Sequence, residues 1–272
     1  MKLNYEEYGG GSPLIILHGL FGSLTNWRTV GRSLSDCYRV INVDLRNHGH
    51  SPHEPGLSYT QMADDVLELM DDLGLGSAQI MGHSLGGKLG MFLADRDPER
   101  VQKLIVVDIA PKRYPPWHQD IFDALNAVNL NQLKSRQQAK DMMAEHVFDA
   151  TVREFLATNL ERHDGQWRWR FNLPALAEAY PGTSEMPELH GFFAGPVLFI
   201  RGANSSYIED TDFPLLRKHF PGACLVTLTN AKHWPHIEAP EAFLTAVRQF
   251  LSEGCHREPF EKVLTYRKPT NL

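Results

Sequence analysis

The chain has 272 residues, of which 42% are hydrophobic and 22% are charged, and its formal net charge is −6. These values are ordinary for a globular protein, and the length suits one substantial α/β domain with an insertion. The acidic balance, together with the lack of a run dense in lysine or arginine, argues against nucleic acid as a main partner.

The N-terminal segment and the cysteines bear on the compartment. The first ten residues lack the apolar run of a secretory signal, and the longest apolar run, residues 104–110, is too short to span a bilayer. The three cysteines, Cys37, Cys224 and Cys255, show no C-x-x-C spacing, which favours isolated thiols in a reducing compartment. We therefore expect a cytoplasmic protein without a membrane span.

Short β-like runs alternate with helical patterns along the chain, which predicts βαβ units and a mostly parallel sheet. Several runs are continuously apolar, as expected of strands that are covered on both faces. The expected strands are residues 2–8, 14–17, 40–44, 79–82, 103–108, 197–201 and 224–228. Among the helices, Thr60 is the expected N-cap of one that stops at Gly74, and others are expected over residues 85–95 and from Pro240 onward.

The alternation breaks between about residues 111 and 196. This stretch has helical patterns, an aromatic cluster and no convincing parallel strand, with helices expected over residues 121–128, 136–148 and 152–160. Because it is too long for one crossover, we interpret it as a lid over the C-terminal edge of the sheet, where open α/β sheets bind ligands. The alternative is a run of ordinary sheet-covering helices.

The expected organisation is therefore an α/β core with one insertion and a tail. The core comprises residues 1–111 and 196–253, the helical lid residues 112–195, and the C-terminal tail residues 254–272. The tail is polar with little periodicity, and we expect a surface arm.

Residues 82–86, Gly-His-Ser-Leu-Gly, match G-x-S-x-G, the pattern of a sharp turn that lifts a serine nucleophile clear of its sheet. An expected strand precedes the motif and an expected helix follows it, which is the context that the motif requires. A serine hydroxyl is a weak nucleophile unless a base takes its proton, and that base needs an orienting acid. Ser84 is the predicted nucleophile.

In proteins with this motif the chain order is serine, acid, histidine, so the base is expected in a late loop. Residues 231–241 form such a loop and offer His233 and His236. We predict His233 as the base because it comes first after the expected strand. His236 is expected to have a structural hydrogen-bonding role.

A second loop, His18-Gly19-Leu20-Phe21-Gly22, follows an apolar strand directly. Glycine there lets the backbone approach a reacting carbonyl, and backbone N–H donors of this kind contribute roughly 3–4 kcal/mol each in acyl transfer. The first expected donor is Leu85, and the second is Leu20 or Phe21, with Leu20 preferred. A tight turn braced by His18 is the simpler interpretation of the same residues.

Four motifs in this order, residues 18–22, 44–51, 82–86 and 233–238, resemble the α/β-hydrolase superfamily. Residues 46–49 (Arg-Asn-His-Gly), 108–111 (Asp-Ile-Ala-Pro) and 202–205 (Gly-Ala-Asn-Ser) resemble the YbfF-type esterases in particular. The resemblance covers about residues 2 to 251. It implies an α/β-hydrolase fold, with a mostly parallel central sheet, helices on both faces and a helical lid insertion. It also implies that the loop of Asp44, Arg46 and His48 braces the nucleophile region.

The acid departs from the superfamily pattern, because Ser205 occupies the usual position after the strand at residues 197–201. The resemblance to YbfF-type enzymes implies that Asp108, at the end of the preceding strand, is the acid. That strand directly follows the nucleophile strand, so its end should lie beside Ser84. The alternatives are three carboxylates further along the chain, Glu209, Asp210 and Asp212, and a plain turn-capping role for Asp108.

The leading hypothesis is a carboxylesterase-type serine hydrolase acting on acyl esters, and on thioesters as a second class. The alternatives are a carbon–carbon bond hydrolase, a cofactor-free perhydrolase and a non-catalytic ligand sensor. Neither metal nor cofactor is expected, since zinc-type histidine motifs, a dinucleotide fingerprint and a P-loop are all missing from the sequence. We expect a monomer or small homo-oligomer.

Aromatic side chains of the lid and the two loops are expected to line an apolar acyl pocket above Ser84. The candidates are Phe21, Trp117, Trp169 and Trp234. Arg113, Arg168 and Arg170 could meet an anionic leaving group, although a solvated lid face is the commoner explanation for such residues.

Overall fold

The computed structural model describes residues 1–115, 117–253 and 262–264, the last three by their backbone alone. The strands of the main sheet are β1 (Tyr5–Tyr8), β2 (Ser12–Leu17), β3 (Tyr38–Val43), β4 (Ala78–His83), β5 (Val101–Val107), β8 (Val197–Gly202), β9 (Ala223–Leu228) and β10 (Lys262–Leu264). Within the described residues they form one sheet in the order β1-β3-β2-β4-β5-β8-β9-β10. Strand β1 is antiparallel to β3 and every other pair is parallel. The predicted mostly parallel sheet is confirmed.

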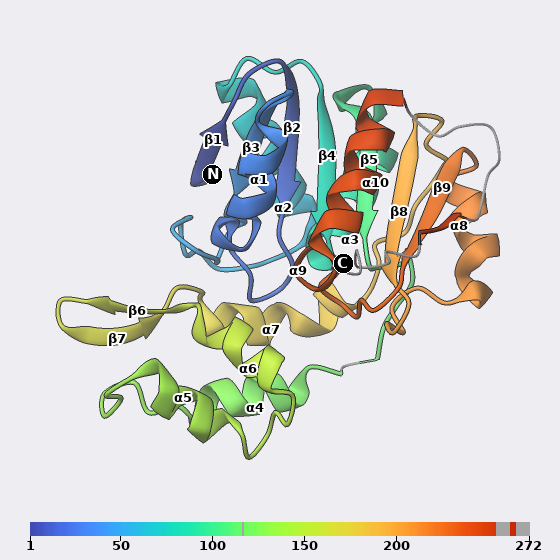
Figure 1. Cartoon of the computed structure of the whole chain (residues 1–272). Helices are drawn as coiled ribbons and strands as arrows, with labels where there is room; N and C mark the ends of the chain where they lie inside the picture. The colour runs from blue at the N-terminus through green and yellow to red at the C-terminus, as the bar shows by residue number, and fades with distance from the viewer. Residues whose placement is uncertain (116, 254–261, 265–272) are drawn as a thin grey trace, which may run out of the picture.

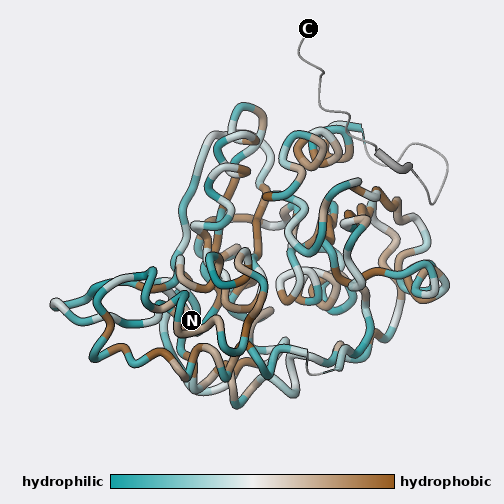
Figure 2. Tube along the Cα trace, turned by 60° about the horizontal axis from the view of Figure 1, so that its bottom comes forward, coloured by the Kyte–Doolittle hydropathy of each residue, from teal (hydrophilic) through white to brown (hydrophobic). Residues whose placement is uncertain are grey.

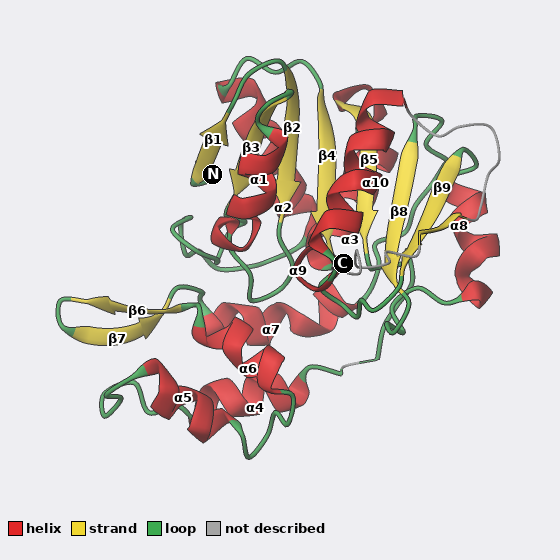
Figure 3. Ribbon diagram, in the orientation of Figure 1, coloured by secondary structure: helices red, strands yellow, loops and turns green. Residues whose placement is uncertain are grey.

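Helices cover both faces of this sheet because successive side chains of a strand point to opposite faces. In β2, Leu14 and Ile16 pack in one core cluster with residues of α1 (Arg28–Leu34) and α10 (Pro240–Glu253). The alternate residues, Ile15 and Leu17, pack in a second cluster with α2 (Tyr59–Asp72), α3 (Leu85–Arg96) and α8 (Phe213–His219). Helices α1 and α10 lie in front of the sheet in Figures 1 and 3. The apolar strand segments, brown in Figure 2, lie inside the core.

Helix α2 begins earlier than its expected cap. Its N-cap is Ser58, whose hydroxyl accepts the Gln61 amide, while the Gln61 side chain accepts the Ser58 amide in return. This capping box satisfies two groups at the helix start, so Thr60 lies inside the first turn and the expectation for it is wrong. Gly74 follows the helix with a φ of 68°, as the expected stop signal requires.

Between β5 and β8 the chain forms a separate layer beyond the carboxyl ends of the parallel strands (Figure 1). Its elements are α4 (Gln119–Ala127), α5 (Arg136–Met143), α6 (Ala150–Ala157), β6 (Leu160–His163), β7 (Gln166–Trp169) and α7 (Leu173–Ser184). We call this layer the lid. The β6–β7 hairpin is not among the expected elements. Asp164 and Gly165 at its turn both have positive φ, 50° and 80°, the backbone that an Asp-Gly hairpin turn requires.

The lid is joined to the core by polar contacts at several points. Asn172 donates its amide to the Asn47 carbonyl at 2.9 Å. The buried Lys88 ammonium of α3 donates to the carbonyls of Ser184 and Glu185 at 2.7 and 2.9 Å, and burial lowers the pKa of Lys88 to about 7. These contacts fix both ends of α7 against the core.

The cysteines differ from expectation. Cys224 is disulfide-bonded and Cys37 is free and exposed, while Cys255 lies outside the described residues. The expectation of isolated thiols is therefore wrong for Cys224. Sequence spacing could not show this, because pairing depends on Cα atoms that lie within about 7 Å in the fold.

The predicted surface arm, residues 254–272, lies outside the described residues except for 262–264. Those three residues extend the sheet as β10, in parallel pairing with β9. None of the described helices is both long and apolar enough to cross a membrane.

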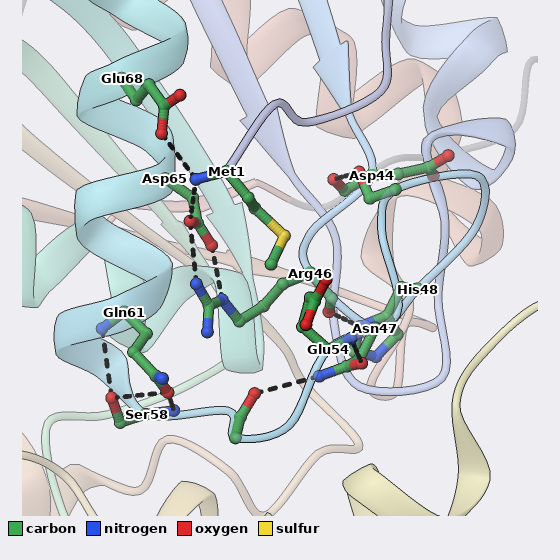
Figure 4. Close-up of polar contacts among 12 residues, drawn as sticks. Met1, Asp44, Arg46, Asn47, His48, Glu54, Ser58, Gln61, Asp65 and Glu68 are labelled. Carbon is green, nitrogen blue, oxygen red and sulfur yellow. Dashed lines mark hydrogen bonds and ion pairs between the residues drawn. The ribbon is translucent and has the colours of Figure 1, made fainter.

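The loop after β3 is braced by buried charges (Figure 4). Arg46 makes two hydrogen bonds, of 2.6 and 2.9 Å, to the carboxylate of Asp65 on α2, and the Met1 amino group binds the same carboxylate at 2.8 Å. Asp44 accepts the backbone amides of Leu24 and His50 at 2.7 and 2.9 Å. These contacts agree with the bracing role expected for this loop.

Replacing Arg46 with leucine is expected to lower the free energy of unfolding by about 3–5 kcal/mol, because Asp65 would keep a buried charge without its main partner. Urea denaturation at neutral pH measures the change. The control is Arg39→Leu, which breaks the more exposed pair with Glu7 and should cost less than about 1 kcal/mol. Equal losses in the two variants would contradict the bracing role.

Candidate active site

Ser84 stands at the turn between β4 and α3 with φ 52° and ψ −115°, a strained backbone for a residue other than glycine. The turn is possible because its neighbours lack side chains. A Cβ on Gly82 would lie 2.1 Å from the Gly86 carbonyl oxygen, and one on Gly86 would lie 2.4 Å from the Leu17 carbonyl oxygen. The G-x-S-x-G motif therefore forms the turn for which it is known, with Ser84 at its apex.

Asp108 follows β5 directly, and β5 is the parallel neighbour of β4. Its side chain is completely buried. One carboxylate oxygen accepts the Gly202 amide at 3.0 Å, and the other accepts both the Ser205 hydroxyl and His233 Nδ1, the latter at 2.8 Å. The sheet therefore brings Asp108, His233 and Ser84 together at the carboxyl ends of its parallel strands.

The alternative acids are engaged elsewhere. Asp210 pairs with Arg201 at 2.7 Å, and Asp212 pairs with Lys112 at 2.7 Å. Glu209 lies 3.6 Å from the same lysine. Asp108 therefore has the contact to His233 that an orienting acid needs.

His83, the residue before the serine, holds the loop of His233 through a hydrogen bond to its backbone. His83 Nε2 donates to the His233 carbonyl at 2.7 Å. Since a carbonyl can only accept, His83 carries its proton on Nε2. Burial lowers the pKa of His83 well below its usual value, so the ring stays neutral and keeps this tautomer.

His236, three residues further, behaves differently from expectation. Its ring stacks on Trp27 at a centroid distance of 4.1 Å. Within the described part of the chain neither ring nitrogen has a hydrogen-bond partner, and burial lowers its pKa to about 3. The expected hydrogen-bonding role is wrong, because His236 packs as a ring among Trp27, His83 and Phe243.

The loop after β2 runs beside the serine. A Cβ on Gly19 would lie 3.2 Å from Ser84 Cβ, so the backbone passes as close as glycine allows. His18 braces this loop by donating from Nδ1 to the Gly19 carbonyl at 2.8 Å and accepting the Leu45 amide on Nε2 at 3.0 Å. Burial lowers the pKa of His18 to about 4, which keeps it neutral.

The lid reaches the same loop through one side chain. Asn159, which is fully buried, donates its side-chain amide to the Phe21 carbonyl at 2.7 Å. Phe21 has a φ of 59°, a left-handed backbone that this contact helps to hold. Sequence reasoning did not single out Asn159, since nothing in its neighbours marks it.

A cavity of about 340 Å³ opens above Ser84, between the core loops and the lid. Three of the four aromatic residues expected there line it, together with Ser84 and His233. The lining includes Leu20, Phe21, Ser84, Trp117, His118, Tyr207, His233 and Trp234. Asp108 lies behind His233, buried below the surface of the cavity.

Trp169 does not line this cavity, and the expectation for it is wrong. It ends β7 and stacks on Phe171 at a centroid distance of 5.3 Å, while Phe171 packs on Phe21. Phe171 thus separates Trp169 from the space above Ser84. Trp169 lines a second cavity with Arg168 and Arg170.

Two residues of the site were not predicted as functional. Ser205 stands at the usual acid position and donates its hydroxyl to Asp108, so its position in the motif was a usable signal. Tyr207 stacks on His233 at a centroid distance of 3.9 Å and an interplanar angle of 18°. Nothing in the sequence marks Tyr207. Among the described residues, no histidine, cysteine or carboxylate side chains gather in a group that could hold a metal ion.

This fold and this arrangement define the class of the protein. The chain belongs to the α/β-hydrolase family, whose sequence model, described as alpha/beta hydrolase fold, matches residues 12–240. The predicted superfamily is thus confirmed.

Individual relatives place the chain more narrowly. It is 38% identical to esterase YbfF of Escherichia coli over 93% of this chain and 100% of that protein. It is 37% identical to the sn-1-specific diacylglycerol lipase ABHD11 of Mus musculus over 93% of this chain and 86% of that protein. The solved structure of a marine microorganism esterase has a TM-score of 0.89 at 36% identity, covering 92% of this chain and 99% of that one. The chain is a hydrolase of the YbfF type and of the carboxylesterase class.

Replacing Ser205 with alanine is expected to lower kcat/KM for p-nitrophenyl butyrate by about ten- to a hundredfold, because a hydrogen bond to a carboxylate contributes about 1.5–3 kcal/mol. Steady-state kinetics measure the effect. Ser206→Ala changes the adjacent exposed serine and should stay within about twofold of the unmodified protein, since an exposed substitution usually changes a free energy by no more than about 0.5 kcal/mol. Identical kinetics for the two variants would show that the Ser205 contact does not support the site.

Proposed function

We propose that this protein is a serine hydrolase that cleaves carboxylic esters through an acyl-serine intermediate. The observation that carries the proposal is the 2.8 Å hydrogen bond between Asp108 and His233 Nδ1, with His233 and Ser84 on the wall of one cavity. A nucleophile, a base and an orienting acid are the three parts that this chemistry needs.

The first half of the reaction forms the acyl-serine. His233, with its Nδ1–H held by Asp108, takes the proton of the Ser84 hydroxyl on Nε2 as the serine oxygen attacks the ester carbonyl. The tetrahedral intermediate then collapses, and His233 gives the proton to the leaving alcohol. In the second half, water attacks the acyl carbonyl while His233 removes one of its protons. His233 then gives that proton to the Ser84 oxygen as its bond to the acyl group breaks, which releases the acid and restores the serine hydroxyl.

The negative oxygen of the tetrahedral intermediate needs preorganised donors. We assign this role to the backbone amides of Leu85 and Leu20. Leu85 is the first residue of α3, where the helix dipole favours negative charge, and Leu20 follows Gly19 beside Ser84. Each donor would contribute roughly 3–4 kcal/mol to transition-state stabilisation.

We propose carboxylic esters as the substrate class and do not include thioesters of phosphorylated carriers in this proposal. Arg113 pairs with Glu185 at 3.2 Å and Arg168 with Glu161 at 2.6 Å. Neither these arginines nor Arg170 lines the cavity above Ser84, so they give no support to recognition of an anionic leaving group. Thioester hydrolysis, the carbon–carbon hydrolase, the perhydrolase and the sensor remain predictions from sequence, as does the cytoplasmic location.

Replacing Ser84 with alanine is expected to lower kcat for p-nitrophenyl butyrate by about 10⁵–10⁶-fold, as loss of a triad nucleophile does. The unmodified protein should be labelled covalently by a serine-directed phosphonate, and mass spectrometry should locate the label on Ser84. Substantial turnover by the variant, or a label elsewhere, would exclude the acyl-serine pathway.

Replacing Asp108 with asparagine is expected to lower kcat by about 10⁴-fold, because an amide at that position favours the wrong tautomer of the histidine. Asp210→Asn is the matched control, since Asp210 is exposed and pairs with Arg201, and its activity should stay near that of the unmodified protein. If the two effects were reversed, the acid would be Asp210 and the assignment of Asp108 would fail.

A further inference from the structure

Tyr207 lines the cavity, and contacts to its ring, its backbone and its hydroxyl hold it in place. Its ring stacks on His233, its amide donates to Ser205 Oγ at 3.3 Å, and its carbonyl accepts the Tyr114 hydroxyl. Its own hydroxyl lies 3.1 Å from Nε2 of His118, a lid residue on the same cavity wall. The hydroxyl is therefore held in one place beside the base.

The protons in this group can be assigned from its contacts. The Tyr180 hydroxyl accepts the His118 backbone amide at 3.0 Å and lies 2.7 Å from His118 Nδ1. Burial lowers the pKa of His118 to about 4, so the ring is neutral and carries one proton. If Tyr180 donates to Nδ1, that proton is on Nε2 and is donated to the oxygen of Tyr207.

The opposite assignment frees the other hydroxyl. With the proton on Nδ1, His118 would donate to Tyr180, Tyr207 would donate to Nε2, and the hydrogen of the Tyr180 hydroxyl would be left over. Tyr180 lines a second cavity, of about 350 Å³, so a ligand or water there can accept that hydrogen, and both assignments are open to the free protein. The first assignment leaves the unused hydrogen on Tyr207, which faces the cavity where a ligand or water can accept it.

A ligand oxygen that can only accept selects the first assignment, in which the Tyr207 hydroxyl donates to it. Within residues 1–115 and 117–253, its hydroxyl has His118 as its sole protein partner. Burial raises the pKa of Tyr207 above its usual range, so the hydroxyl keeps its hydrogen at neutral pH.

The side of the cavity on which this donor stands identifies the part of the substrate that it meets. His233 must deliver a proton to the leaving alcohol, so the alcohol half of an ester lies beside His233 during acylation. Tyr207 stacks on that ring, and Trp117 packs against Tyr207 at a centroid distance of 5.8 Å. A polar donor in this otherwise aromatic corner favours an alcohol that carries a second oxygen.

We propose that Tyr207, oriented by His118 of the lid, is a specificity-determining residue that donates a hydrogen bond to a second oxygen in the alcohol half of the ester. The substrate class is the monoester of a diol or polyol, or an ester of an ether alcohol. The inference rests on the proposed function, since it takes His233 as the group that protonates the leaving alcohol.

The test uses two butyrate esters that differ by one group of similar size. 2-Hydroxyethyl butyrate has a hydroxyl where propyl butyrate has a methyl, and the acyl half is the same in both. The readout is the ratio of their kcat/KM values, hydroxyethyl over propyl. In Tyr207→Phe, which keeps the ring on His233 and removes the hydroxyl, this ratio is expected to fall about three- to tenfold, the effect of one neutral hydrogen bond.

An unchanged ratio in Tyr207→Phe overturns the proposal. If the ratio is unchanged because activity toward both esters has fallen equally, Tyr207 only positions His233. His118→Leu gives a second measurement should Tyr207→Phe not fold, with a fall of the same sign expected and no change in the ratio contradicting the proposal. Ser84→Ala is assayed in parallel. Hydrolysis of both esters by Ser84→Ala at the unmodified rate would refute the serine mechanism itself. If Ser84→Ala is inactive and the ratio for Tyr207→Phe is unchanged, only the role of Tyr207 is refuted.

Discussion

The carboxylate of Asp108 is the point at which three distant parts of the chain meet. A buried charge is tolerated only where its oxygens are hydrogen-bonded, and those of Asp108 are bound by Gly202, Ser205 and His233. Gly202 ends β8, Ser205 follows it and His233 follows β9, whereas Asp108 directly follows β5. The order of the parallel strands therefore positions the base, because the loops at their carboxyl ends all converge on this one group.

Neutral histidines support this arrangement. Burial lowers the pKa values of His18, His83 and His118, to about 4 for the first and the third, so each ring is neutral and carries a single proton. His18 braces the loop of Leu20, and His83 holds the backbone of His233. A charged His18 ring would lose its bond from the Leu45 amide, since only a neutral imidazole both accepts and donates. His18 and His83 thus act as fixed hydrogen-bonding groups rather than as acids or bases.

The lid takes part in the site as well as covering it. Asn159 holds the Phe21 carbonyl, and His118 contacts Tyr207 on the wall beside His233. Lys88 and Asn172 fix the two ends of α7 to the core. Because the lid contacts both the loop of the expected oxyanion donors and the residue that packs on the base, a change in its position would affect the chemistry as well as access.

The sequence by itself determined the elements that depend on local pattern. Continuous apolar runs mark the covered strands, and the glycines beside Ser84 mark a turn that only glycine permits. The order of serine, acid and histidine directed attention to His233, and the serine at position 205 indicated that the acid had moved to another strand. The strands and the turn can be predicted because neighbours within a few residues set them. The base and the acid were predicted from the motif order and the family resemblance instead.

Only the tertiary structure decided the contacts between distant residues. It brought Ser205 to Asp108, placed Tyr207 and Asn159 in the site, removed Trp169 from the cavity and gave His236 a stacking role. It also showed a disulfide at Cys224 and a hairpin in the lid. The physical reason is that side-chain packing and buried hydrogen bonds depend on which loops meet at the end of the sheet, and one sequence read along its length does not contain that distance information.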